Sequence, residues 1–308
     1  MSVRHVLSAT TTCVLAVSGL ATKSAFAMPV GQPADARAAA VVAPSAEMLE
    51  AAGVDFTGIV ALNDCSGALV RFVNSAPTDK AMVITNGHCI ETGFLNPGEV
   101  RVDRASTRAF RLLNAAATST LATLHADRVL YATMTDTDMT LYRLTQTFAD
   151  IEGATGTHAL TISDQHPAPG APIRVVSGYW KKIYSCTIDR FVYRLKEGNW
   201  TFKDSVRYTQ PGCETIGGTS GSPIVHADSH EVIGINNTGN DNGERCTEDN
   251  PCEVDEAGNV VVEKGASYGQ ELYLIYTCLS PTNTLDLTVA GCELPKPARN
   301  LRLVTAAP

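Results

Sequence analysis

Residues 217–223 have the sequence Gly-Gly-Thr-Ser-Gly-Ser-Pro, and the apolar pair Ile224 and Val225 follows directly. Glycine on both sides predicts a tight turn that holds the Ser220 hydroxyl out from the backbone, immediately before a buried strand. The N–H groups of Gly218 and Ser220 are then candidates for an oxyanion hole. Taken alone, the segment fits an ordinary turn between two strands equally well.

A serine hydroxyl is a weak nucleophile at neutral pH and needs a neighbouring base. The strongest candidate is His88, which follows the strand-like run 81–85 and the turn Asn86-Gly87 and precedes Cys89. The other six histidines, His166 among them, lie near the start of the chain or in polar, loop-like stretches. We therefore expect His88 to act as the base.

A base of this kind needs a carboxylate that fixes its tautomer and stabilises the imidazolium. Asp138 fits best, because it directly precedes the apolar run 139–144 and a strand-end acid would reach the same edge as His88. Asp136 is the competitor, since period-two alternation would place it on the same face of a strand.

The first residues predict export. Arg4 precedes a run of apolar and small residues that ends at Ala25-Phe26-Ala27, so we expect a signal peptide over residues 1–27 and secretion to the extracellular space. The run is too short and too interrupted for a membrane span. Residues 28–53 are expected to form a propeptide or N-terminal arm.

Of the nine cysteines, only Cys13 lies in this leader. An even set in an exported chain predicts four disulfides, and neighbour pairing is our working choice among the possible connectivities. The eight are Cys65, Cys89, Cys186, Cys213, Cys246, Cys252, Cys278 and Cys292. We expect no zinc site among them, because no C-x-x-C pair is present.

From Phe56 onward, short runs rich in Val, Ile, Thr and Tyr alternate with turn residues, which is typical of an all-β protein. Weak helix candidates occur at 45–52 and 115–126. We expect a first barrel over 54–152, a second over 153–282 with its connection near 150–166, and a C-terminal surface tail over 283–308. The expected strands are 58–62, 66–72, 81–85, 138–144, 173–177, 184–191, 206–208, 223–225, 231–236 and 270–274.

Four motifs in this order give the chain a family resemblance. The motifs are Cys65-Ser66-Gly67 and the runs 85–89, 138–141 and 218–223. Through these motifs, residues 56–279 resemble bacterial trypsin-like serine peptidases. The separations of 138 − 88 = 50 and 220 − 138 = 82 residues suit that family.

The resemblance implies two packed antiparallel β-barrels of the chymotrypsin-like fold, with the active site in the cleft between them. It implies catalytic residues His88, Asp138 and Ser220, an oxyanion hole at Gly218 and Ser220, and an acyl-enzyme route for a protein or peptide substrate. The substrate-binding positions it implies are Thr215, Asn236, Asn237 and Thr238.

Two positions depart from relatives of known specificity. Thr219 stands where trypsin has the aspartate used in activation, and Asn236 stands where glutamyl endopeptidases keep a histidine for the substrate carboxylate. Glu214 lies at the offset of trypsin's acidic pocket base, although an exposed loop acid is the preferred interpretation because Cys213 interrupts the local match.

Other function classes fit less well. The net charge of −8 argues against nucleic acid or anionic lipid as partner. There is no H-E-x-x-H or phosphate-loop motif, and the acidic loop 240–244 is expected to be solvated, so we expect no metal and no cofactor. The chain is expected to be monomeric. A catalytically silent binding protein of the same fold and an esterase using Ser220 remain the alternatives.

Overall fold

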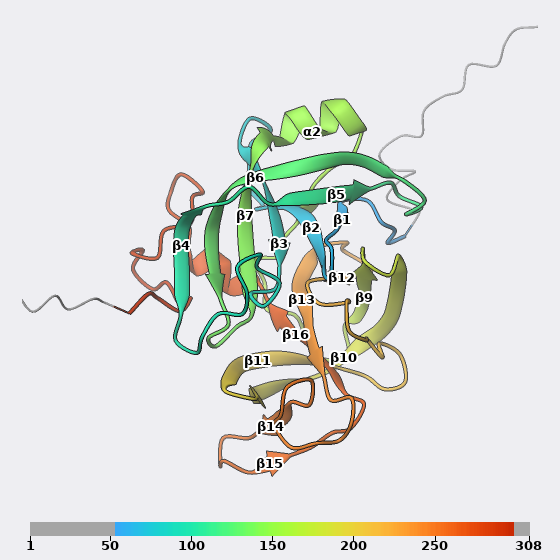
Figure 1. Cartoon of the computed structure of the whole chain (residues 1–308), viewed down its shortest axis with the longest axis vertical. Coiled ribbons are helices and arrows are strands. Elements are labelled where there is room, and N and C mark those ends of the chain that lie inside the picture. The colour runs from blue at the N-terminus through green and yellow to red at the C-terminus, as the bar shows by residue number, and fades with distance from the viewer. Residues whose placement is uncertain (1–52, 299–308) are drawn as a thin grey trace, which may run out of the picture. The chain divides into compact units, whose positions relative to one another are not determined.

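A computed structural model describes residues 53–298 of the chain, and nearly all of its regular structure is β-strand (Figure 1). The expected signal peptide, most of the N-terminal arm and the helix candidate at 45–52 lie outside the described residues. Within residues 53–298, no helix is long and apolar enough to cross a lipid bilayer.

The first sheet closes into a six-stranded barrel. Its strands pair in the order β1-β5-β6-β7-β3-β2, and β2 pairs with β1 to complete the ring. Two further strands attach outside the ring, β4 against β6 and the short β8 in parallel against β2. The strands are β1 (Ile59–Ala61), β2 (Ser66–Arg71), β3 (Lys80–Thr85), β4 (Val100–Ala105), β5 (Ala109–Leu113), β6 (Thr120–Thr133), β7 (Met139–Thr147) and β8 (Leu160–Thr161).

The second sheet also closes, through the order β9-β10-β11-β16-β13-β12 and back to β9. The hairpin β14-β15 extends it from one end of β10, at the bottom of Figure 1. The strands are β9 (Pro172–Ser177), β10 (Lys182–Glu197), β11 (Trp200–Tyr208), β12 (Pro223–His226), β13 (Val232–Gly239), β14 (Cys252–Val254), β15 (Val260–Val261) and β16 (Ser267–Glu271). Two packed antiparallel barrels, the expected fold class, are therefore present.

Alternation of polar and apolar residues explains much of this pairing. In β5, Phe110 and Leu112 are buried while the residues between and before them are exposed, as a strand with one face on a core requires. The Phe110 ring packs edge-to-face on Tyr142 of β7, at 5.1 Å between centroids. One apolar cluster fills the first barrel and continues into the second, and a smaller cluster around Ile173, Val175 and Ile224 fills the rest of the second barrel.

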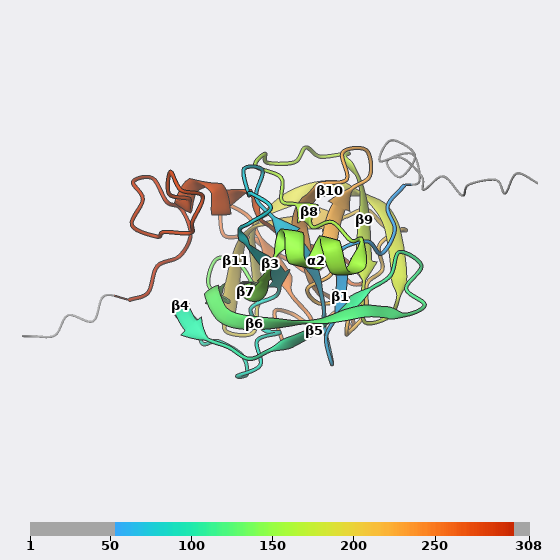
Figure 2. The same cartoon turned by 90° about the horizontal axis from the view of Figure 1, so that it is seen from above.

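One local prediction was wrong, and one helix was not predicted. The helix candidate at 115–126 is largely strand β6, in which Leu124 and Ala126 are both buried, the spacing of one strand face. Conversely, the expected connection after residue 150 contains the helix α2 (Phe148–Thr155), which lies across the outside of the first barrel (Figure 2). Thr147 and Asp150 form a capping box that satisfies the free N–H groups at its start.

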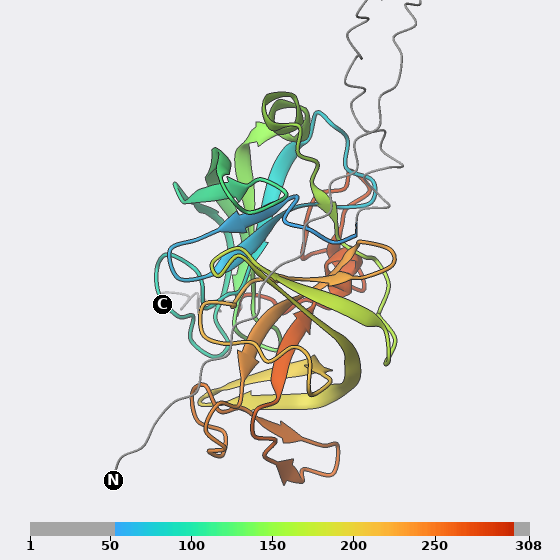
Figure 3. The same cartoon turned by 90° about the vertical axis from the view of Figure 1, so that its right-hand side faces the viewer.

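The segment after the second barrel returns to the first, as Figures 1 and 3 show in red. It starts with the 3₁₀ helix η1 (Tyr273–Cys278), where the Tyr276 hydroxyl accepts a hydrogen bond from the Val73 N–H. Further on, Leu294 is buried and the carbonyl of Pro295 accepts a hydrogen bond from Tyr131 of β6, at 3.0 Å. We call residues 273–298 the C-terminal strap, because they connect the two barrels.

Candidate active site

His88 is fixed by the end of β3 and by a disulfide. The last five residues of β3 are buried, and the chain then turns through Asn86 and Gly87. Gly87 is required because an added Cβ would lie 2.0 Å from the carbonyl oxygen of Thr133. The neighbouring Cys89 is bonded to Cys65, so both sides of the histidine are anchored to the first barrel.

Asp138 is buried, 1% exposed, immediately before β7, and makes two hydrogen bonds to His88. Its Oδ2 lies 2.6 Å from His88 Nδ1, and its Oδ1 accepts from the His88 backbone N–H at 3.0 Å. The competing Asp136 points elsewhere and forms an ion pair with Lys203 of β11 at 2.7 Å. The structure therefore brings Asp138, and not Asp136, to the imidazole.

Two opposing effects set the protonation of His88. Burial disfavours the imidazolium and lowers the pKa, but the adjacent Asp138 carboxylate, through its charge and its hydrogen bond, raises it. The charges of Glu197 and Asp249 act in the same direction as Asp138. The net result is a raised pKa, so the ring is a stronger base than a free histidine.

Ser220 lies in the turn before β12, and the first barrel contacts that turn directly. The Ser66 N–H donates to the Ser220 carbonyl at 2.8 Å. Gly221 has φ +74°, and a Cβ there would come within 2.1 Å of Thr85 Oγ1. These close contacts explain why glycine follows the serine.

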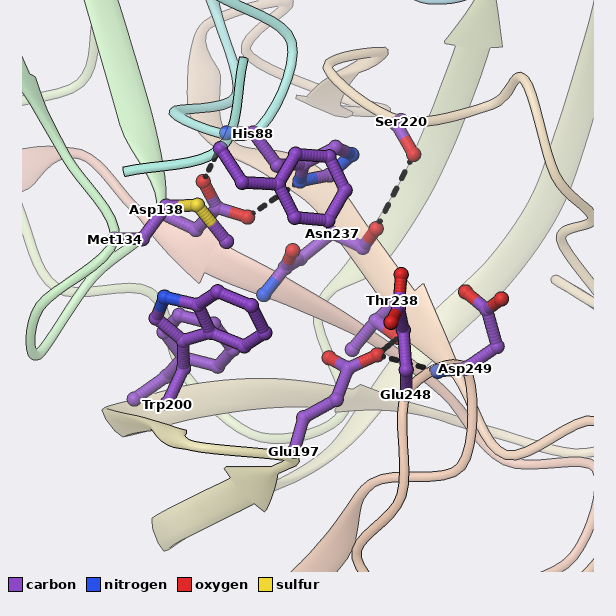
Figure 4. A pocket seen from close by; sticks show the side chains of 12 residues that line it. His88, Met134, Asp138, Glu197, Trp200, Ser220, Asn237, Thr238, Glu248 and Asp249 are labelled. Atoms are coloured by element: carbon purple, nitrogen blue, oxygen red, sulfur yellow. Dashed lines mark hydrogen bonds and ion pairs between the residues drawn. The ribbon is translucent and has the colours of Figure 1, made fainter. Parts of the chain in front are cut away.

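The Ser220 hydroxyl is not hydrogen-bonded to His88 in this structure. Its Oγ donates instead to the carbonyl of Asn237 at 3.5 Å (Figure 4). In the figure the His88 ring lies between Asp138 and Ser220, and all three line one pocket, which we call the His88 pocket. A change of the Ser220 χ1 rotamer, between staggered wells, would redirect the hydroxyl.

The oxyanion-hole candidates have free donors. Neither the Gly218 N–H nor the Ser220 N–H donates to an acceptor within residues 53–298, whereas Thr219, Gly221 and Ser222 all do. Gly218 has φ +87° and lies against the ring of Tyr179, which leaves no room for a side chain. Two unpaired amides beside a serine hydroxyl are the donor set that stabilises a tetrahedral oxyanion.

A second pocket, the Thr215 pocket, also borders Ser220. It is lined by Thr215, Asn236, Asn237 and Thr238, the four residues expected to bind substrate. The side chain of Asn236 is engaged: its Nδ2 donates to Thr219 Oγ1, and its Oδ1 accepts from the Tyr208 hydroxyl. Its side chain therefore supports the turn rather than facing a ligand.

Several acids near these pockets were not predicted. Glu197, at the end of β10, is buried, and its Oε1 accepts from Thr238 Oγ1 and from the Asp249 N–H. Burial raises the pKa of Glu197 to about 7, against the effect of these hydrogen bonds and of His88. Asp241 and Asp249 line the Thr215 pocket, whereas Glu214 is exposed and does not.

Aromatic rings cover the His88 pocket. Phe94 is half exposed and packs edge-to-face on His88, with 5.7 Å between ring centroids, and on Trp200 at 5.8 Å. Trp200 in turn donates from its indole N–H to the Leu95 carbonyl, which holds the two barrels together at this point.

The eight cysteines form four disulfides between sequence neighbours, the pairing chosen from the sequence. Cys65–Cys89 supports His88, and Cys186–Cys213 anchors the approach to Thr215. Cys246–Cys252 closes the loop that carries Asp249, and Cys278–Cys292 closes the C-terminal strap. Cys65 and Cys89 lie near His88 but offer no metal ligand while bonded to each other.

The chain is similar to known proteins of one kind. A family model for a trypsin-like peptidase domain matches residues 65–235, which include His88, Asp138 and Ser220. No curated protein matches the sequence.

Among solved structures, the MamO protease domain of Magnetospirillum magneticum is 15% identical, with 73% of this chain and 96% of that chain covered and a TM-score of 0.44. The Rv3671c protease of M. tuberculosis is 12% identical, with 77% and 81% covered and a TM-score of 0.41. Thermobifida fusca Protease A is 16% identical, with 71% and 90% covered and a TM-score of 0.38.

Proposed function

Because the chain belongs to the trypsin-like peptidase family, we propose that it is a secreted serine endopeptidase whose nucleophile is Ser220. The observation that carries the proposal is the pair of hydrogen bonds from His88 to the buried Asp138 carboxylate. Such a carboxylate holds the proton on Nδ1 and leaves Nε2 free to accept one. The four disulfides and the leader sequence support export into an oxidising compartment.

In the proposed reaction the Ser220 hydroxyl first rotates from the Asn237 carbonyl towards His88. Its oxygen attacks the scissile carbonyl carbon while His88 Nε2 takes the proton, and the oxyanion is held by the N–H groups of Gly218 and Ser220. His88 then gives the proton to the leaving amine. Water attacks the resulting ester in the same way and releases the acid and free Ser220.

A catalytically silent binding protein is the second candidate, because the Ser220 hydroxyl faces Asn237 in this structure. A fluorophosphonate probe separates the two, since it reacts only with an activated serine. We expect mass spectrometry to find the probe on Ser220 of the purified mature protein and no labelling in Ser220→Ala. Peptide hydrolysis should fall about six orders of magnitude in that variant, the scale of triad deletions in subtilisin.

Ser222→Ala is the matched control for this experiment. Ser222 lies two residues away, is buried, and its hydroxyl has no hydrogen-bond partner within the described chain, so its loss should leave folding and labelling intact. Absence of labelling in folded wild-type protein would reject the peptidase and leave the binding protein. Labelling with ester hydrolysis but no peptide cleavage would indicate an esterase.

For the preferred substrate, we propose peptides with Lys or Arg before the cleaved bond. Asp241 and Asp249 line the Thr215 pocket beside Ser220, and neither forms an ion pair with Lys, Arg or His in the described residues. Burial and the charge of Asp249 raise the pKa of Asp241, so a cation between them would relieve the repulsion. Both side chains are exposed, and charges of this kind steer a substrate of opposite sign and favour it over neutral ones.

The test is a peptide library digested by wild type and by Asp241→Asn/Asp249→Asn. We expect the variant to lose roughly tenfold or more in kcat/KM for basic substrates, with little change for neutral ones. Asn tolerates the left-handed backbone of Asp249, at φ +57°, so the loop should keep its shape. Glu214→Gln, which removes an exposed acid outside the pocket, should cleave as wild type does, and equal loss in that variant would contradict the assignment.

A further inference from the structure

Three side chains outside the active site converge on one point. His166 comes from the connection between the barrels, Asp204 from β11, and Glu271 from the end of β16. His166 Nε2 lies 3.1 Å from Asp204 Oδ2 and 3.4 Å from Glu271 Oε1. The three donor atoms are all within 4.8 Å of one another, close enough to bind a single ion.

The histidine ring is held in a fixed orientation. Its Nδ1 lies 2.7 Å from the carbonyl oxygen of Pro167, and a carbonyl can only accept, so Nδ1 carries a proton. The ring also packs against Phe191 at 4.4 Å and Tyr273 at 5.1 Å between centroids. In the neutral ring the lone pair of Nε2 therefore faces the two carboxylates, the arrangement that metal-binding histidines adopt when a carbonyl holds the other nitrogen.

Glu271 adds an independent observation. Its side chain is 4% exposed, and its Oε1, the oxygen directed at His166, has no hydrogen-bond partner within residues 53–298. A buried carboxylate oxygen without a partner is costly.

We propose that His166 Nε2, Asp204 Oδ2 and Glu271 Oε1 bind one divalent transition-metal ion, with Zn²⁺ as the best match. One imidazole and two carboxylates suit zinc, and three protein ligands leave a fourth position for water. Water can reach it because the side chains of His166 and Asp204 are about two-fifths exposed, 38% and 45%. The ion would connect the segment between the barrels to two strands of the second barrel.

The alternative is a protonated His166 that pairs with the carboxylates and binds no metal. Equilibrium dialysis against Zn²⁺ separates the metal site from this alternative. The full chain is first treated with a chelator, and bound zinc is then measured by elemental mass spectrometry. All proteins carry Ser220→Ala, which prevents self-cleavage. We expect about one Zn²⁺ per chain. Loss of a residue that only hydrogen-bonds to a metal ligand typically weakens metal binding by roughly 10- to 100-fold. Glu271→Gln removes a ligand itself, so it should weaken zinc binding by more than that.

Two controls keep the result interpretable. His158→Ala removes another histidine that pairs with a carboxylate, Glu152, and should bind zinc as the background protein does. Glu271→Gln is nearly isosteric and removes a buried acid, and its circular dichroism should match that of the background. Failure of the folded background protein to bind Zn²⁺, binding of Ca²⁺ without Zn²⁺, or unchanged zinc affinity in Glu271→Gln would each overturn the proposal.

Discussion

The charge of Glu197 connects two titrating groups that line the His88 pocket, Glu197 itself and His88. Burial raises the pKa of Glu197 to about 7, and its negative charge, once formed, helps to raise the pKa of His88. Ionisation of one group therefore depends on the other. Because both hydrogen bonds to Glu197 are accepted at Oε1, glutamine can replace the acid and keep them.

We expect Glu197→Gln to shift the acid limb of the kcat/KM profile to lower pH, by a fraction of a pH unit. Removing this negative charge makes the imidazolium less favourable, so His88 loses its proton at lower pH. The measurement is kcat/KM for a small peptide substrate from pH 5 to 9. Glu256→Gln, in the turn after β14, is the control, and a shift to higher pH in Glu197→Gln would contradict the account.

The same variant should change stability in a defined pH range. Folded Glu197 keeps its proton up to about pH 7, whereas in the unfolded chain the proton is lost near the ordinary glutamate pKa of 4.5. The folded state thus binds more protons in this window, and its stability falls as pH rises through it. Glu197→Gln removes that cost and should be more stable than wild type at pH 8, by on the order of 2 kcal/mol in urea unfolding, with no gain near pH 4.

Residues at the site differ in how far the sequence could predict them. His88, Asp138 and Ser220 each occupy a short segment of unusual composition, and the structure places them around one pocket. Glu197, Asp241 and Asp249 have no such signal, because they reach the cleft from the end of a long strand and from a loop. His166, Asp204 and Glu271 are separated by 38 and 271 − 204 = 67 residues, so only the fold brings them together.

At the level of elements, strand prediction succeeded where one face of a strand is continuously buried. β3 and β13 are almost wholly buried; β3 was expected nearly in full, and β13 as far as Asn236. β4, by contrast, has no buried residue, contains three charged residues and lies outside the first ring, where it pairs with β6 alone. Its sequence offers little hydrophobic pattern, because its place depends on β6 rather than on the core.

Helix α2 was missed although a local signal exists. Thr147-Phe148-Ala149-Asp150 has the spacing of a capping box, with the threonine side chain bonding to the Asp150 N–H and the aspartate to the Thr147 N–H. The helix is only eight residues long and buries Phe148 and Ile151 alone. A helix this short has too few apolar positions to establish a period, so only its cap could have identified it.

At the scale of the whole molecule, the two barrels are joined by the C-terminal strap. Asn283 donates to Ser75 Oγ of the first barrel at 3.3 Å, and the rings of Phe72 and Tyr276 pack edge-to-face at 5.7 Å. Leu294 adds a buried apolar contact, of a kind that stabilises by about 2 kcal/mol. The expected tail thus contributes to the folded unit as far as residue 298.

The disulfides that close the strap and the Asp249 loop should therefore have different effects when removed. Cys278→Ser/Cys292→Ser opens a loop of 14 residues, for which chain entropy predicts a loss of about 3 kcal/mol in the free energy of unfolding. Because the strap contacts none of the catalytic candidates, kcat/KM should stay within about twofold of wild type well below the melting temperature.

Cys246→Ser/Cys252→Ser is the matched comparison. It opens a loop of only 6 residues, for which chain entropy predicts a loss of about 2 kcal/mol in the free energy of unfolding. This loop carries Asp249, which lines the Thr215 pocket. We expect this variant to lose activity on basic substrates more than on neutral ones, while thermal unfolding changes less than in the strap variant. Thermal unfolding and kcat/KM on matched basic and neutral peptides measure both effects. If the strap variant lost activity selectively and the loop variant did not, the Asp249 loop would have no part in binding substrate, and the strap would affect the Thr215 pocket.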